Sequence, residues 1–340
     1  MIPKKVILDC DPGSDDAIAM MLAMKSDAID LIGVTTVNGN RIVPKTTENA
    51  LRVVQFMKSS VPVYRGCEEP IICNEIPGRK PGLPRVTLND CHGDFLPLPE
   101  AEIRTEKEHA VFYLVKTLME SKGDIYVAAV GPLTNLAMAL RIEPKIAGKI
   151  KQLVIMGGGH CGANASPAAE FNFYADPEAA KIVMDSAIPK VILPLDATWR
   201  ACLSEEKCKE LAQLGTPEAK VAAALVQKRI DNLKVNDVSE HNYALRHQAG
   251  TVAGAMLYRY DNHMAPIHDA LAIAYLIDEN VVTELADANV DIDIAGGLCD
   301  GRMVADFHNT KKSKDPVTAK VALNSDAGLF TDMLFAALGK

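Results

Sequence analysis

Short apolar runs alternate with amphipathic segments along most of the chain. The runs are rich in Val, Ile and Leu and end at Gly, Pro or Asp, which is typical of buried strands; they lie at residues 6–9, 29–37, 124–130, 151–156 and 190–195. Amphipathic spacing predicts helices at residues 15–24, 45–58, from 133 onward, 176–185, 217–229 and 269–277. Because strands and helices alternate, the pattern predicts an α/β fold, with an open, mostly parallel sheet and helices on both of its faces.

Two segments fit this alternation poorly. Residues 73–105 are rich in Pro and Gly, and residues 230–247 are polar and weakly periodic. Loops of this length inside a compact domain usually serve a function, so we interpret both as active-site loops. No linker separates two independently periodic halves, and the whole chain, residues 1–340, is predicted to form a single domain.

Composition and charge narrow the classes of partner. The chain has 340 residues, 48% of them apolar, and a formal net charge of −8. This negative balance argues against a nucleic-acid partner, which requires clustered Lys and Arg. The eight cysteines are scattered without a C-x-x-C pair. The first residues lack the long apolar run of a signal peptide, and no apolar run approaches the length of a membrane span. We therefore expect reduced thiols, a cytoplasmic location, no membrane partner, and a small neutral substrate or a cation as ligand.

Four carboxylates lie within eight residues at the end of the first predicted strand: Asp9, Asp11, Asp15 and Asp16. Open α/β sheets bind ligands at the carboxyl ends of their strands. Two such charges about 4 Å apart repel by roughly 4 kcal/mol at an effective dielectric near 20, so the cluster needs a cation or raised pKa values. Helix capping explains Asp15 and Asp16 but neither Asp9 nor Asp11. The loop is therefore predicted to bind a hard cation such as Ca²⁺ or Mg²⁺.

The same loop carries a resemblance to a known family. DCDPGSDDAIAMMLA (9–23) resembles the N-terminal signature of the inosine-uridine preferring nucleoside hydrolases. Further segments resemble that family in family order: VNGN (37–40), VGPLTNLAMAL (130–140), MGGG (156–159), AEFNFYADPEAA (169–180), IHDALAIAYL (267–276) and GRMVADF (301–307). The resemblance covers nearly the full length and implies the nucleoside hydrolase fold around a Rossmann-like core.

The resemblance also implies a ligand set and a reaction centre. One Ca²⁺ is expected on the carboxylates of Asp11, Asp16 and Asp269 and on the backbone carbonyl of Val130. Asp11 is expected to act as general base on the attacking water, Asn40 to lie beside that water, and His268 to assist the leaving base. Asp9, at the root of the turn, is expected to orient the loop.

The substrate contacts follow from the same resemblance. Ribose is expected to contact Asp15, Met156, Asn164, Glu170 and Asn172, and the base to contact His92 and Tyr260. Gly157–Gly159 is interpreted as a close backbone approach to the sugar, since no P-loop Lys-Ser/Thr follows it. Trp199 is interpreted as a packing residue. After His92-Gly93 the chain continues with Asp94-Phe95-Leu96-Pro97 where relatives carry a Gly-rich tail, which leaves the base pocket less defined.

The implied activity is hydrolysis of the N-glycosidic bond of ribonucleosides to ribose and free base, through an oxocarbenium-like transition state and with inversion. His268 and His92 favour a pyrimidine-accepting or broad inosine/uridine specificity over a purine-specific one. Two other classes stay open at this point: a haloacid-dehalogenase-like phosphatase, which also begins with Asp-x-Asp, and a non-catalytic nucleoside-binding protein. Relatives commonly form dimers or tetramers, so a homodimer or homotetramer is expected.

Overall fold

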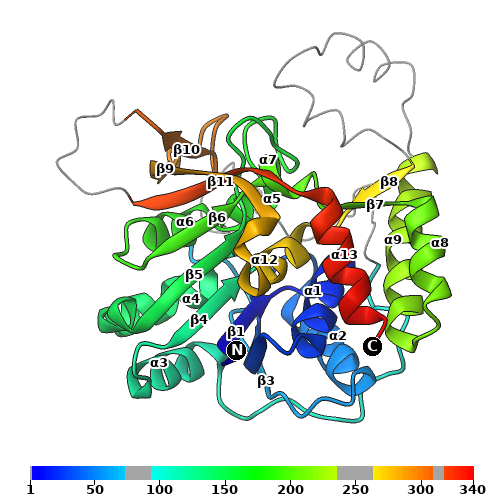
Figure 1. The fold of residues 1–340 in the computed structure, drawn as a ribbon. Helices are drawn as coiled ribbons and strands as arrows, with labels where there is room; N and C mark the ends of the chain where they lie inside the picture. Colours follow the sequence, from blue (N-terminus) through cyan, green and yellow to red (C-terminus); the bar gives the residue numbers. More distant parts are fainter. Residues whose placement is uncertain (1, 73–92, 236–262, 309–317) are drawn as a thin grey trace, which may run out of the picture.

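The computed structural model describes residues 2–72, 93–235, 263–308 and 318–340. Its centre is a nine-stranded sheet in the order β10-β9-β11-β6-β5-β4-β1-β2-β3 (Figure 1). The strands of this sheet are β1 (Lys4–Cys10), β2 (Ile29–Thr36), β3 (Val63–Arg65), β4 (Ile125–Ala129), β5 (Ile150–Met156), β6 (Lys190–Leu193), β9 (Val282–Ile292), β10 (Met303–Asp306) and β11 (Ala319–Ser325). Two further strands, β7 (Cys202–Ser204) and β8 (Met264–Pro266), pair with each other in an antiparallel ribbon.

The sheet is parallel from β3 through β6 to β11, and only β9 runs antiparallel to its neighbours. This confirms the predicted open, mostly parallel sheet. The order β3-β2-β1-β4-β5-β6 is that of a doubly wound Rossmann-type sheet, in which the direction of winding reverses between β1 and β4. Ligands of such sheets bind in the crevice at this reversal. The acidic loop follows β1, so it lies at that crevice.

Helices cover both faces of the sheet, as predicted (Figure 1). They are α1 (Ser14–Lys25), α2 (Val43–Phe56), α3 (Ala110–Glu120), α4 (Thr134–Ile142), α5 (Phe171–Ala175), α6 (Pro177–Met184), α7 (Leu195–Thr198), α8 (Glu205–Gln213), α9 (Pro217–Val235), α12 (His268–Ile277) and α13 (Ala327–Leu338). Alternation along β1 divides the core: Val6 and Leu8 pack with α1, α2, α12 and α13, whereas Ile7 packs with α3, α4 and α6.

Helix α1 is buried on every side over residues 14–23, because it packs against α2, α9, α12 and α13 as well as the sheet. Its residues are accordingly mostly apolar in all directions, Ile18 to Ala23 among them. Such a helix has almost no freedom to shift. The carboxylates in its first turn, Asp15 and Asp16, are therefore held at fixed positions.

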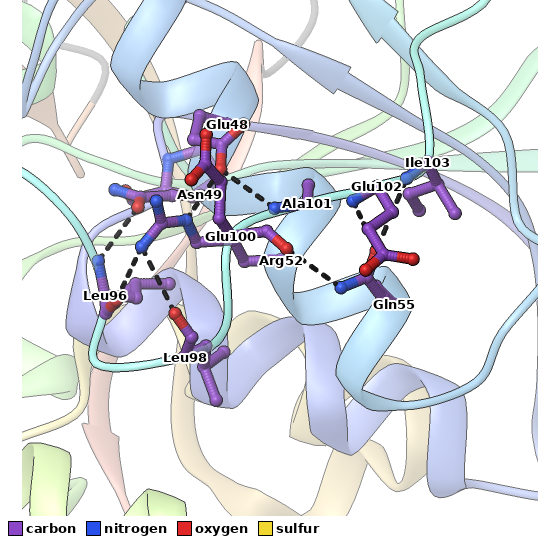
Figure 2. Close-up of polar contacts among 11 residues, drawn as sticks. Glu48, Asn49, Arg52, Gln55, Leu96, Leu98, Glu100, Ala101, Glu102 and Ile103 are labelled. Atoms are coloured by element: carbon purple, nitrogen blue, oxygen red, sulfur yellow. Dashed lines mark hydrogen bonds and ion pairs between the residues drawn. The ribbon is translucent and has the colours of Figure 1, made fainter.

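Residues 94–103 are held along α2 by hydrogen bonds to its side chains (Figure 2). Asn49 accepts a hydrogen bond from the Leu96 amide at 2.9 Å, and Arg52 Nη1 donates to the carbonyls of Leu96 at 3.3 Å and Leu98 at 3.2 Å. Gln55 accepts from the Glu102 amide at 2.6 Å. This part of the predicted loop 73–105 is thus held by side chains of a helix, while residues 73–92 lie outside the described residues.

The second predicted loop begins later than expected. The helix predicted at 217–229 extends to Val235, so residues 230–235 are helical, and residues 236–262 lie outside the described residues. Among the helices that the structure describes, none is both long enough and apolar enough to cross a bilayer. The single-domain assignment stays a prediction.

Candidate metal centre and active site

The structure brings together carboxylates from two distant parts of the chain. Asp15 and Asp16 begin α1, and Asp269 lies in the first turn of α12. One oxygen of each lies within 4.8 Å of the others, and all three side chains are buried. Asp11, on the turn before α1, is buried as well. The predicted approach of Asp269 to Asp16 is therefore present, whereas Asp11, the third predicted carboxylate ligand, is not a member of this group of oxygens.

Burial and like charge act on this group together. Burial, with the Asp16 carboxylate next in importance, raises the pKa of Asp11 well above its ordinary value. Burial and then the Asp15 carboxylate raise the pKa of Asp269 in the same way. Buried acids that repel one another are stabilised by a positive charge among them, and carboxylate oxygens suit a hard divalent cation. The donor set therefore fits a metal such as Ca²⁺.

The turn between β1 and α1 is held closed by its own acids. Asp16 accepts hydrogen bonds from the Asp11 amide at 3.2 Å and the Gly13 amide at 2.9 Å. Asn40, which follows β2, donates its backbone N–H to Asp11 Oδ2 at 2.5 Å. Its Nδ2 also donates to the Asp11 carbonyl at 3.1 Å and to Asp16 Oδ2 at 3.3 Å. Asn40 thus fixes the orientation of the Asp11 carboxylate.

Gly39 and Gly131 leave the space that the Asp11 carboxylate occupies. A Cβ atom on Gly39 would collide with Asp11 Oδ2, and one on Gly131 would lie 2.6 Å from Asp11 Oδ1. Real Cβ atoms essentially never approach so closely. The carboxylate is therefore enclosed between the turn after β2 and the turn after β4, with no room for a side chain on either.

Asp9 lies near the end of β1, before this turn, and is fully buried. Its Oδ1 accepts from Thr35 Oγ1 at 2.6 Å and from Asn135 Nδ2 at 2.7 Å, while Oδ2 is buried and has no hydrogen-bond partner among the described residues. Burial raises the pKa of Asp9 to about 6. Asn135 also donates to the Thr36 carbonyl at 3.0 Å. Asp9 therefore joins the ends of β1 and β2 to α4, an arrangement that accords with the loop-orienting role expected of it.

On the other side of the crevice, the short helix α5 holds the ends of β4 and β5. Asn172 Nδ2 donates to the carbonyls of Val130 at 2.8 Å and Met156 at 3.0 Å. Glu170 accepts from the amides of Gly158 at 2.7 Å and Asn172 at 2.9 Å. Burial raises the pKa of Glu170 to about 7. The expected metal ligand Val130 O and the expected ribose contacts Met156, Glu170 and Asn172 thus form one hydrogen-bonded unit.

The glycines in the loop after β5 are explained by its backbone conformation and packing. Gly158 has a φ of +75°, and side chains on Gly157 or Gly158 would collide with the Phe173 ring. Close packing on Phe173 therefore accounts for these glycines without a bound sugar. Asn164 accepts from the Phe171 amide at 2.8 Å, which ties the loop to α5. Trp199 is buried and would collide with a side chain on Gly162, in agreement with its interpretation as a packing residue.

His268 begins α12, directly before Asp269, and is half-buried. Its Nδ1 lies 2.8 Å from Thr198 Oγ1, which comes from α7. This hydrogen bond fixes the orientation of the imidazole beside the acidic cluster. The two other residues expected at the base, His92 and Tyr260, lie outside the described residues.

The sequence did not point to the arginine that lies beside the acidic cluster. Arg229, on α9, places Nη1 2.8 Å from Asp15 Oδ1, and the two side chains are 11% and 7% exposed. Nη1 also lies 3.5 Å from Ser14 Oγ. No motif marks this arginine, because it comes from a helix far along the chain. Thr198 was missed for the same reason, whereas Asn135 lies within the family-like segment 130–140 but was assigned no role.

The fold and the site together define an α/β protein with a candidate metal centre where the winding of its sheet reverses. Residues 6–332 match the family model described as inosine-uridine preferring nucleoside hydrolase, and the chain belongs to this family. It is therefore an enzyme, a ribonucleoside hydrolase. The family match also removes the phosphatase alternative.

Individual relatives agree with the family match. The chain is 36% identical to the pyrimidine-specific ribonucleoside hydrolase RihB of Escherichia coli O157:H7, over 97% of this chain and 95% of the relative. Among solved structures it resembles the plant nucleoside hydrolase PpNRh1, with a TM-score of 0.83 and 26% identity over 99% of each chain. It also resembles the purine-preferring ribonucleoside hydrolase from Gardnerella vaginalis, with a TM-score of 0.82 and 25% identity over 99% of this chain and 98% of the other.

Proposed function

We propose that this ribonucleoside hydrolase is Ca²⁺-dependent and accepts pyrimidine nucleosides, with uridine as a substrate. The proposed Ca²⁺ ligands are Asp11, Asp16, Asp269 and the Val130 carbonyl. The observation that supports the metal is the buried group of Asp15, Asp16 and Asp269 oxygens within 4.8 Å of one another. The pyrimidine preference is supported by 36% identity to RihB, against 25% to the purine-preferring G. vaginalis enzyme.

When bound, the cation would supply a positive charge that lowers the pKa of water and holds ribose hydroxyls. Asp11 is the proposed general base. A carboxylate held beside the attacking water is a suitable acceptor for its proton. The Asn40 amide, at 2.5 Å from Asp11 Oδ2, keeps the carboxylate in one orientation while it accepts the proton.

His268 is proposed to assist the departure of the base. Because its Nδ1 is engaged by Thr198, Nε2 is the nitrogen we assign to the departing base. A proton or hydrogen bond from Nε2 would neutralise the negative charge that develops on the base as the glycosidic bond breaks. His92 and Tyr260 are proposed to contact the same base.

The ribose is proposed to be bound by Asp15, Met156, Asn164, Glu170 and Asn172. The hydrogen bonds among Glu170, Asn172 and the strand ends preorganise part of this surface before substrate arrives. Such contacts accelerate the reaction only if they strengthen as the sugar ring flattens toward the oxocarbenium-like transition state. A homodimer or homotetramer and a cytoplasmic location stay predictions.

The test is incubation of the purified enzyme with uridine, cytidine, inosine and adenosine in Ca²⁺ buffer, with release of reducing sugar as the measurement. We expect ribose from uridine, with a kcat/KM above that for adenosine. Faster hydrolysis of the purine nucleosides would overturn the pyrimidine preference. Binding of nucleosides without ribose release would favour the non-catalytic alternative.

A further inference from the structure

The buried ion pair between Arg229 and Asp15 divides the acidic cluster. Asp15, Asp16 and Asp269 all offer an oxygen to a common cation, and Asp15 also lies 2.8 Å from the guanidinium of Arg229. A guanidinium binds a carboxylate oxygen along a fixed direction, which competes with coordination of the same carboxylate to a metal. The charge of Arg229 also acts on Asp269, where it offsets part of the rise in pKa that burial causes, but the ion pair at 2.8 Å is with Asp15.

We infer that Arg229 is a positioning residue that keeps Asp15 off the cation and reserves it for the ribose hydroxyls. The inference rests on the proposed function, which assigns Asp15 to the sugar. In the absence of Arg229, Asp15 would be a further buried carboxylate beside the three proposed carboxylate ligands, and a divalent cation would draw it into coordination. The enzyme would then bind metal more tightly and ribose less well.

The position of α9 does not depend on Arg229. Its buried residues Ala222, Val226 and Ile230 pack in the same apolar core as α1. A second ion pair joins the same two helices away from the cluster: Lys25 Nζ lies 2.7 Å from Glu218 Oε1, with side chains 23% and 15% exposed. Glu218→Gln is thus a matched control, because it removes an α1–α9 ion pair without touching the acids.

The first readout is the Ca²⁺ affinity of the enzyme without nucleoside, measured by calorimetric titration of metal-stripped protein. We expect Arg229→Met to bind Ca²⁺ at least tenfold more tightly than wild type. Arg229→Lys, which keeps the charge, should lie between the two, and Glu218→Gln should match wild type. Unchanged or weaker Ca²⁺ binding by Arg229→Met would overturn the inference.

The second readout is uridine hydrolysis at saturating Ca²⁺. We expect Arg229→Met to raise KM at least tenfold, with a smaller change in kcat and partial rescue in Arg229→Lys. In an Asp15→Asn background the Arg229→Met change should add little to KM, because the arginine would act through Asp15. An equal KM increase in both backgrounds would contradict this route.

Failure of the proposed function is separable from failure of this inference. An enzyme that releases no ribose from any nucleoside contradicts the proposed function, but the Ca²⁺ titration still compares Arg229→Met with wild type. If wild type binds no Ca²⁺ and Arg229→Met binds it, the positioning role stands while the Ca²⁺-dependent mechanism fails. If neither protein binds it, both are overturned.

Discussion

Asp269 places a carboxylate oxygen within 4.8 Å of one from Asp16, although the two residues begin different helices, α12 and α1. The helices pack directly against each other, so this approach is built into the core. Two anions held this way cost stability in the folded state, and a bound cation offsets that cost. The arrangement therefore lowers the stability of the metal-free protein and favours the binding of a cation.

Removal of one charge from the Asp16–Asp269 pair should therefore change the melting temperature in opposite directions with and without metal. Asp269→Asn keeps the side-chain shape and removes like-charge repulsion, so in EDTA we expect it to melt a few degrees above wild type. In Ca²⁺ the order should reverse, because the variant loses a ligand. Differential scanning calorimetry measures both. Asp278→Asn, at the other end of α12, is the control and should melt with wild type in both buffers; an Asp269 variant that melts lower in EDTA as well contradicts the repulsion.

The enclosure of Asp11 predicts a glycine requirement. Gly39→Ala would push a Cβ atom into the Asp11 carboxylate and to 2.9 Å from Pro132 Cδ, so we expect kcat for uridine to fall at least tenfold. The fold should persist, with a circular dichroism spectrum like that of wild type. Gly148→Ala, whose Cβ would meet nothing within 4 Å, is the matched control. Full activity in Gly39→Ala would show that the orientation of Asp11 is unimportant.

The role of His268 is tested by the choice of leaving group. His268→Ala should reduce kcat for uridine by roughly 10²–10⁴-fold, the usual range for a lost general acid. It should reduce kcat for p-nitrophenyl riboside far less, because nitrophenolate departs without a proton. Thr198→Val, which removes the hydroxyl 2.8 Å from Nδ1, should show the same selectivity to a smaller degree. Equal losses on both substrates would remove His268 from this role.

Glu170 should impose a pH dependence on stability. Burial raises its pKa from 4.5 to about 7, so the folded protein holds a proton that the unfolded chain has already released. The stability that this proton contributes is complete below the unfolded pKa and is lost as the pH rises through the folded one. Relative to Glu170→Gln, wild type should lose about 3 kcal/mol of unfolding free energy over this interval. Urea denaturation in EDTA at about pH 5 and pH 8 measures it; a constant difference between the two proteins contradicts the raised pKa.

The sequence predicted the sheet centre well for a physical reason. Strands such as β1 and β5 are buried on both faces, so they are continuous apolar runs that end sharply at Asp or Gly. Edge elements carry a weaker signal. β3 has only three residues, and β9 is buried at alternate positions only in its second half. Neither was predicted, because a half-exposed strand resembles an ordinary polar loop.

Some residues of the site could be predicted from the sequence and others could not. Asp11, Asp16 and Asn40 follow strand ends, where topology alone brings side chains together. Arg229 and Thr198 reach the site from helices whose orientation depends on the packing of the whole core. No local pattern distinguishes them from surface or capping residues, so only the folded structure identifies them.

Metal dependence of turnover tests the central proposal most directly. The enzyme is stripped with EDTA, its metal content is checked by elemental analysis, and ribose release from uridine is followed as Ca²⁺ is added back. We predict no measurable turnover in the stripped enzyme and full recovery as Ca²⁺ approaches one ion per chain. Undiminished hydrolysis by a demonstrably metal-free enzyme would contradict the account.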